Sequence, residues 1–165
     1  MQPVFRILLA VCATLVAAGC SANLSREARS QVTYEGDFLP LRQQPQQYAG
    51  EVVMLGGKII ENRADKERTE LVVLQLALNS ANRPTDEDRS DGRYIVRSEQ
   101  FLDPAIYPPG TPITVIGRVS GSEKRAIGEM DYTYPLLELI EIKKWNPADG
   151  RNPRVHFGFG VGTVF

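Results

Sequence analysis

The sequence predicts a mainly β protein, a small five-stranded Greek-key barrel of the OB type, with a β-sandwich as the alternative. Glycine and proline are frequent, with 14 and 11 residues, and they separate short apolar runs. A turn that leads into a strand, which then bends at glycine, occurs twice, over residues 48–59 and 107–119. With three further apolar runs, these repeats fit five short strands in one small domain.

The predicted strands are the apolar segments, residues 51–60, 69–78, 93–97, 113–119 and 132–145. Residues 62–68 and 121–128 are predicted turns. In the second strand the even positions, from Val72 to Leu78, form the apolar face that we expect in the core, and the odd positions are mixed and expected to be half covered. Pro135 places the start of the last strand at an edge or a bulge.

The N-terminus has the features of an export signal. Arg6 precedes an apolar run from Ile7 to Ala18 that only Thr14 interrupts. This run is too short to cross a bilayer core, which takes about 20 residues, but it has the length of a signal-peptide apolar region. The signal is therefore excluded from the fold.

Small residues end this run directly before a cysteine, in the order Leu15-Val16-Ala17-Ala18-Gly19-Cys20. The segment resembles the lipobox of bacterial lipoproteins, although Ala17 stands where leucine is most common. The resemblance implies cleavage between Gly19 and Cys20, followed by acylation of Cys20. Each buried CH₂ contributes roughly 0.8 kcal/mol, so several acyl chains would give stable anchoring. Ser21, where an aspartate would favour the inner membrane, points to outer membrane lipid.

The mature chain divides into a polar tether, one β domain and a tail. The predicted bounds are signal peptide 1–19, lipidated N-terminus and tether 20–38, β domain 39–146 and tail 147–165. Loss of Arg6 leaves 18 basic against 20 acidic residues, a net charge of −2. This balance argues against binding to nucleic acid, which needs a strongly basic surface. Pro40 and Pro45 limit any helix before the first strand to a short turn.

Several motifs occur in the same order as in the Slp family of outer membrane lipoproteins. They are Pro45-x-x-Tyr48-x-Gly50, Gly56-Gly57-Lys58-Ile59-Ile60, Thr69-x-Leu71-x-Val73-Leu74-x-Leu76, Phe101-Leu102-Asp103-Pro104 and Thr114-Val115-x-Gly117. With the lipobox, the resemblance covers residues 1 to 145. It implies a lipid-anchored protein of the Gram-negative outer membrane and implies no reaction. The tail departs from the Pro- and Tyr-rich ends that are common in this family.

Side chains that carry catalysis are scarce in the mature chain. Its single histidine, His156, lies in the tail, and its single cysteine is the one expected to carry lipid. One histidine without a free thiolate excludes a Cys–His dyad and does not fill a zinc site. The acidic loop of Asp86, Glu87, Asp88 and Asp91 lacks the EF-hand spacing and is interpreted as a solvated loop. We therefore expect no catalytic residue, no metal and no cofactor.

Five residues of these motifs are interpreted as structural: Gly56, Gly57, Asp103, Pro104 and Gly117. Glycine in a strand allows a close approach or a bulge, and Asp beside Pro starts a turn. OB-type barrels bind oligonucleotides or oligosaccharides on one face. The aromatic residues are too few and too scattered here to predict a stacking platform there, namely Tyr94, Tyr132, Tyr134 and Trp145.

In the tail, an alternating pattern has the period of a strand: Val155, Phe157, Phe159, Val161 and Phe165 alternate with Gly158, Gly160, Gly162 and Val164. It is interpreted as an added strand on the barrel, or alternatively as a strand that pairs with a partner or rests on the membrane. For the whole chain, the sequence predicts an envelope lipoprotein with a structural or interaction role, a possible protein partner in the envelope, and no enzymatic activity. The alternative is a lipoprotein that binds a sugar, lipid or peptide on the barrel face.

Overall fold

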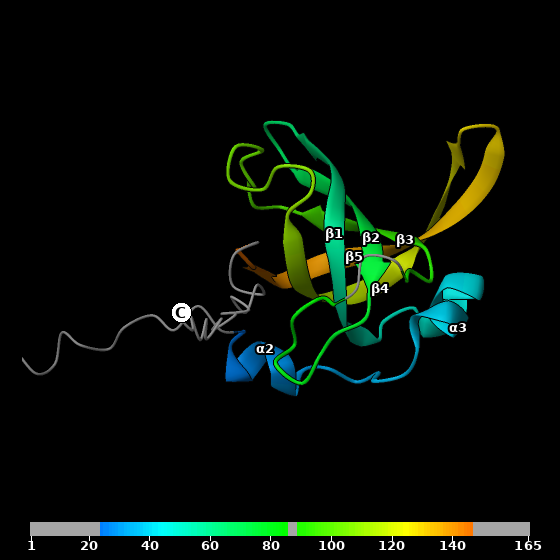
Figure 1. The fold of residues 1–165 in the computed structure, drawn as a ribbon. Coiled ribbons are helices and arrows are strands. Elements are labelled where there is room, and N and C mark those ends of the chain that lie inside the picture. Colours follow the sequence, from blue (N-terminus) through cyan, green and yellow to red (C-terminus); the bar gives the residue numbers. More distant parts are fainter. Residues whose placement is uncertain (1–23, 86–88, 147–165) are drawn as a thin grey trace, which may run out of the picture.

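The computed structural model describes residues 24–85 and 89–146 and shows a closed five-stranded barrel (Figure 1). The strands are β1 (Val52–Ala64), β2 (Thr69–Leu76), β3 (Arg93–Ser98), β4 (Pro112–Ile127) and β5 (Met130–Lys144). Their order around the barrel is β1-β2-β3-β5-β4. Every neighbouring pair is antiparallel except β3 and β5, which are parallel. The predicted fold class, a five-stranded OB-like barrel, is confirmed.

Short helical segments precede the barrel. They are α2 (Arg26–Ser30), α3 (Phe38–Gln43) and the 3₁₀ turn η2 (Pro45–Tyr48). Pro40 lies in the first turn of α3 and Pro45 opens η2, positions at which a missing backbone N–H costs no helical hydrogen bond. Both segments are short, as the two prolines predict.

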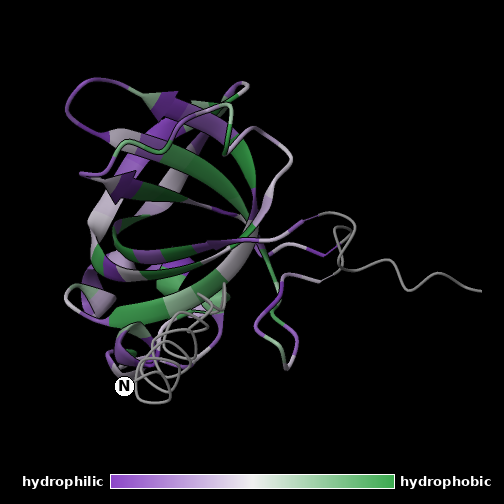
Figure 2. Cartoon of the chain, turned by 90° about the vertical axis from the view of Figure 1, so that its left-hand side faces the viewer, coloured by the Kyte–Doolittle hydropathy of each residue, from purple (hydrophilic) through white to green (hydrophobic). Residues whose placement is uncertain are grey.

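The main core fills the barrel and is closed at both ends. Phe38 and Leu41 of α3 cover one end, and Leu102 from the β3–β4 connection covers the other. Figure 2 shows apolar sequence running along the barrel strands, with hydrophilic sequence concentrated in the connections. The side chains that fill the interior are buried and come from every strand: Val53, Leu55, Ile59, Leu71, Val73, Tyr94, Val96, Ile113, Val115, Val119 and Leu137.

The prediction of which face of the second strand points into the core is wrong. The odd positions Leu71 and Val73 are fully buried inside the barrel, whereas Val72 packs in a separate cluster on the outside. Both faces are apolar because the outer face is covered too, so the alternation of β2 did not distinguish them. The even face that we expected in the core is the outer one.

The predicted turn at 121–128 is also wrong, because most of it is strand. β4 runs to Ile127, and only Gly128 and Glu129 separate it from β5. The register of β4 against β5 shifts near Gly117 and again near Gly121, so the long hairpin bends as it leaves the barrel. It projects from one side of the barrel in Figure 1.

The extent of the predicted tether needs correction. Residues 24–38 belong to the folded unit, because Leu24 and Ala28 of the α2 region pack on Val52 and Ile116, on the outer face of β1 and β4. Tyr34 then forms a parallel bridge with Val53. The polar composition of this segment concealed the few apolar residues that fix it to the barrel.

Candidate functional site

The motif glycines lie where two strands approach closely. A side chain at Gly57 would overlap the carbonyl oxygen of Leu74 on β2, and a Cβ at Gly117 would lie 3.0 Å from the carbonyl oxygen of Glu138 on β5. Gly56 is similarly crowded, with Leu78 as its nearest neighbour. The missing side chains at these positions let neighbouring strands of the barrel approach closely.

Asp103 and Pro104 lie in the β3–β4 connection. The carboxylate of Asp103 accepts a hydrogen bond from the backbone N–H of Ala105 at 2.8 Å, which forms an Asx turn. The side-chain amide of Asn62 on β1 donates to the carbonyl oxygen of Leu102 at 3.0 Å. These contacts fix a loop against the end of the barrel.

Other predicted residues lie outside the described part of the chain. They are Gly19, Cys20, Asp86, Glu87, Asp88, His156 and the alternating tail. Of the acidic loop, Asp91 is described, and its backbone carbonyl accepts a hydrogen bond from Arg42. Over residues 24–85 and 89–146, His, Cys, Asp and Glu form no cluster suited to a metal ion, and no helix is long and apolar enough to cross a membrane.

The outer face of β2 and β3, where OB-type barrels bind their ligands, is covered by the β4–β5 hairpin. Val72 of β2 and Ile95 of β3 are buried there against Tyr134 and Leu136 of β5, with Ile127 from the hairpin packed on the same cluster. Tyr132 accepts a hydrogen bond from the backbone N–H of Arg93 at the start of β3.

Four charged side chains fasten this hairpin to the barrel. Arg125 of the hairpin donates to Glu70 of β2 at 2.8 Å, and its second terminal nitrogen lies 2.7 Å from the other carboxylate oxygen. Arg97 of β3 hydrogen-bonds both Glu70 and Glu123. The four groups alternate in sign, and each side chain is largely shielded from solvent, Glu70 most of all at 16% exposed. We call this set, Glu70, Arg97, Glu123 and Arg125, the ionic latch.

Within the latch, the pKa values of Glu70, Glu123 and Arg125 shift so that each group favours its charged form. The hydrogen bond from Arg125 lowers the pKa of Glu70, and the same arginine lowers the pKa of Glu123. In turn, the hydrogen bond to Glu70 raises the pKa of Arg125. All of these groups therefore stay ionised near neutral pH, which suits a structural contact rather than proton transfer.

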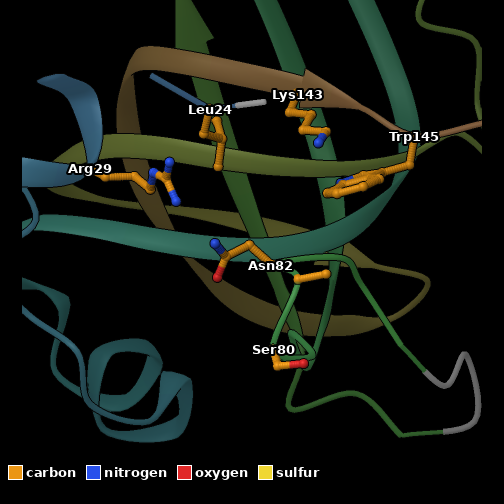
Figure 3. A pocket seen from close by; sticks show the side chains of 7 residues that line it. Leu24, Arg29, Ser80, Asn82, Lys143 and Trp145 are labelled. Atoms are coloured by element: carbon orange, nitrogen blue, oxygen red, sulfur yellow. The ribbon is translucent and has the colours of Figure 1, made fainter. Parts of the chain in front are cut away.

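A pocket of about 270 Å³ opens beside α2 (Figure 3). It is lined by Leu24 and Arg29 from the α2 region, by the connection after β2, and by Lys143 and Trp145 at the end of β5. In Figure 3 the side chains of Arg29, Lys143 and Trp145 converge on one space above Asn82. The described residues that line it include no Asp or Glu.

Trp145 is held in place and surrounded by cations. Its indole N–H donates to the hydroxyl of the fully buried Thr114 at 2.9 Å, and that hydroxyl donates to the carbonyl oxygen of Asn82 at 2.6 Å. The ammonium of Lys143 lies 3.6 Å from the centroid of the Trp145 ring, and the guanidinium of Arg83 lies 5.5 Å from it. Both are cation–π distances.

The helix that carries Arg29 is fixed to the barrel by its own cap. The hydroxyl of Ser25 accepts from the backbone N–H of Ala28, and it donates to Glu141 of β5 at 2.6 Å. The backbone N–H of Ser25 donates to the same carboxylate at 2.8 Å. This wall of the pocket therefore begins at Leu24, four residues after Cys20 in the sequence.

Sequence reasoning missed both the latch and the pocket. Glu70 and Arg125 are 55 residues apart, and Trp145 and Thr114 are 31 apart, so no local pattern joins them. The available signal was chemical: a single tryptophan with Lys143 and Lys144 directly before it.

Comparison with known proteins shows which family and which relatives the chain resembles. A model of the outer membrane lipoprotein Slp family matches residues 17–160. The chain is 28% identical to the uncharacterized lipoprotein YeaY of Escherichia coli K12, over 87% of this chain and 74% of that protein. It is 27% identical to the outer membrane protein Slp of the same strain, over 89% of this chain and 79% of that protein.

Among solved structures, a small single-stranded DNA-binding protein from Streptomyces coelicolor matches with a TM-score of 0.39 and 14% identity, over 61% of this chain and 98% of that one. The barrel assignment rests on the strand order described above. The family model covers most of the chain, and the motifs quoted above fall within it. This chain belongs to the Slp family of outer membrane lipoproteins.

Proposed function

We propose that this chain is cut before Cys20, acylated there and anchored to the periplasmic face of the outer membrane, where it has a non-enzymatic role as an interaction protein of the envelope. Membership of a family of outer membrane lipoproteins supports the anchor. The observation that carries the proposal is the early start of the fold. Leu24 is already buried against the barrel, only four residues after Cys20.

This spacing determines how the domain would sit on a membrane. Four extended residues span at most about 14 Å. An acylated Cys20 would therefore hold the α2 side of the barrel at the headgroups rather than let the domain hang on a long tether. In that position, the surface around α2 is the part of the molecule next to lipid, and the β4–β5 hairpin and the β3–β4 connection are the parts free to contact a protein partner.

A non-enzymatic role agrees with the chemistry of the described residues. The carboxylates of the latch have a lowered pKa, whereas a general acid or base works best with a pKa near the operating pH. The face on which OB-type barrels bind oligomers is filled by the hairpin. The second candidate function, ligand binding, is favoured by one observation, the basic pocket at Trp145.

The anchor is tested by intact mass and membrane fractionation of the native protein and of Cys20→Ala. We expect the wild type to carry acyl groups and to float with outer membrane, and the variant to lose both. Cys12→Ala is the matched control, because it removes the other cysteine of the chain within the predicted signal, and we expect normal acylation. A wild type that is recovered without acyl groups would contradict the proposal.

The orientation needs its own measurement. Protease added to intact cells should spare a protein on the periplasmic face, and the same protease should degrade it once the outer membrane is permeabilised. Degradation in intact cells would place the domain on the cell surface and would leave the anchor unaffected.

A further inference from the structure

We propose that the pocket at Trp145 binds the phosphate of an anionic glycerophospholipid in the membrane that carries the protein. The pocket is the space bounded by Leu24, Arg29, Asn82, Lys143 and Trp145. The inference rests on the proposed anchor, which would bring the pocket to the membrane. It adds a ligand for the pocket that the anchor alone does not imply.

Charge is the first reason. Two cations, Arg29 and Lys143, line the pocket, and a third, Arg83, lies over the indole that forms its wall. The carboxylate on this side of β5, Glu141, accepts two hydrogen bonds from Ser25. Lys143 has a further interaction within the chain, so the charge argument rests on the two arginines. Guanidinium groups beside a space whose described lining has no acid favour an anionic occupant, because their forked donors match the oxygen atoms of phosphate.

The second reason is the tryptophan itself. Trp145 is half-buried, its N–H is satisfied by Thr114, and the rest of the ring forms a wall of the pocket with Leu24. Tryptophan rings with one polar and one apolar side are enriched at the level of lipid headgroups. The combination of an apolar wall with cations matches the headgroup end of a glycerophospholipid, where a charged phosphate lies next to the glycerol that carries the acyl chains.

Position is the third reason and selects a lipid over a soluble anion. Leu24 lines the pocket and lies four residues from Cys20, so this edge of the pocket is within about 14 Å of the proposed anchor. Basic side chains this close to an anionic leaflet are attracted to it, and the attraction decays within a Debye length. A free anion would gain nothing from this placement.

Trp145 is the single tryptophan of the chain, and it therefore reports on the pocket directly. We would reconstitute the purified acylated protein into vesicles of phosphatidylcholine and into vesicles of phosphatidylcholine with phosphatidylglycerol. We expect the mixed vesicles to shift the Trp145 emission to shorter wavelength and to reduce its quenching by acrylamide, an uncharged quencher that the anionic surface does not repel. The anchor is the same in both preparations, so the difference isolates the headgroup.

Variants separate binding from folding. Arg29 is exposed in the last turn of α2, a helix that Ser25 caps, so Arg29→Gln should leave the fold intact and abolish the phosphatidylglycerol-dependent shift, while Arg29→Lys keeps part of it. The matched control is Lys124→Gln, which removes an exposed cation of the β4–β5 hairpin and should leave the shift unchanged.

Three results would overturn the proposal: the same emission in both kinds of vesicle, an equal shift in Arg29→Gln, or an equal shift when inorganic phosphate is added to phosphatidylcholine vesicles. The last would mean a general anion site. The mass of the protein, measured before reconstitution, tells separately whether Cys20 is acylated. If it is not, the anchor fails, and the unanchored protein added to the two kinds of vesicle still tests the pocket, with selective binding to the anionic vesicles as the supporting result.

Discussion

Arg125 and Glu70 join the tip half of the β4–β5 hairpin to the second strand of the barrel through two contacts of 2.8 and 2.7 Å. The pair closes the face that OB-type barrels use for ligands, because the hairpin lies over Val72 and Ile95. The apolar cluster beneath it and the charged groups around it act together, so loss of one ion pair should loosen the hairpin without unfolding the barrel.

Glu70→Gln and Arg125→Gln test this relationship. Both side chains are about a fifth exposed or less, between the fully buried and the fully exposed cases. Each variant should lower the free energy of unfolding by about 1–2 kcal/mol, between the roughly 0–1 of exposed pairs and the 3–5 of buried ones. Urea unfolding measures the loss, and a double-mutant cycle should give a coupling of the same sign. Glu61→Gln in the more exposed Arg63–Glu61 pair is the control, with a smaller change expected.

Acid should weaken the protein through the same latch. The pKa values of Glu70 and Glu123 lie below the ordinary glutamate value of 4.5 in the folded state, chiefly because of the hydrogen bonds from Arg125. As the pH falls, the unfolded chain therefore takes up protons first. The stabilisation from these two carboxylates is complete above pH 4.5, and it is lost as the pH falls through their pKa values in the folded state. Urea midpoints measured from neutral pH downward should drop less steeply in Glu70→Gln. Glu129→Gln, which removes a carboxylate at the hairpin turn outside the latch, is the control.

Gly57→Ala should destabilise the barrel through a direct clash. The added methyl group would overlap the carbonyl oxygen of Leu74 and a methyl of Val73, and the two strands would have to separate. Overpacking of this kind costs about 1–3 kcal/mol. Thermal unfolding of Gly57→Ala beside Gly110→Ala separates a clash from backbone strain, because Gly110 has a φ of 89° and open space around it. An unchanged melting temperature for Gly57→Ala would contradict the close approach of β1 and β2.

The hydroxyl of Tyr94 has no hydrogen-bond partner among the described residues, although the ring is fully buried in the barrel. Burial also raises the pKa of this phenol, so it stays neutral. An unsatisfied buried polar group costs about 1–3 kcal/mol, so Tyr94→Phe should leave stability unchanged or raise it by up to about 1 kcal/mol. Tyr94→Leu, which also removes the ring packed on Phe38, should destabilise. A clear loss of stability in Tyr94→Phe would reveal a partner for the hydroxyl.

The strands could be predicted because their apolar runs are local and are separated by glycine, proline and charge. The second half of β4 could not be predicted in this way. Glu123, Lys124 and Arg125 look like a polar turn. They form a strand because β5 supplies the backbone partners, while Arg97 pairs with Glu123 and Glu70 pairs with Arg125. The prediction of the inner face of β2 failed because of the same hairpin. The hairpin covers the outer face of β2, so apolar residues occur on that face as well as on the inner one.

The pocket was beyond sequence reasoning because its walls come from three distant segments. Arg29 and Trp145 are separated in sequence by most of the domain. The connection that carries Asn82 meets this region through the buried hydroxyl of Thr114 and through Arg83, which lies over the indole. The lipobox, in contrast, is a contiguous motif that the sequence displays completely. A contiguous motif such as the lipobox could be recognised in the sequence, whereas a site whose residues come together only when the barrel closes could not be predicted without the structure.

Ser25 links the N-terminal segment to the barrel, and Ser25→Ala should release it. The hydroxyl caps α2 at Ala28 and donates to Glu141, so its removal breaks two contacts at once. Loss of a serine cap costs typically about 1 kcal/mol. Hydrogen exchange should rise over residues 26–34 while the barrel strands stay protected, because the core inside the barrel is untouched. Ser30→Ala is the matched control: its hydroxyl bonds only the carbonyl of Glu27 within the same helix, and exchange should change little. Equal exchange in Ser25→Ala and the wild type would mean that apolar packing of Leu24 and Ala28 alone holds α2 in place.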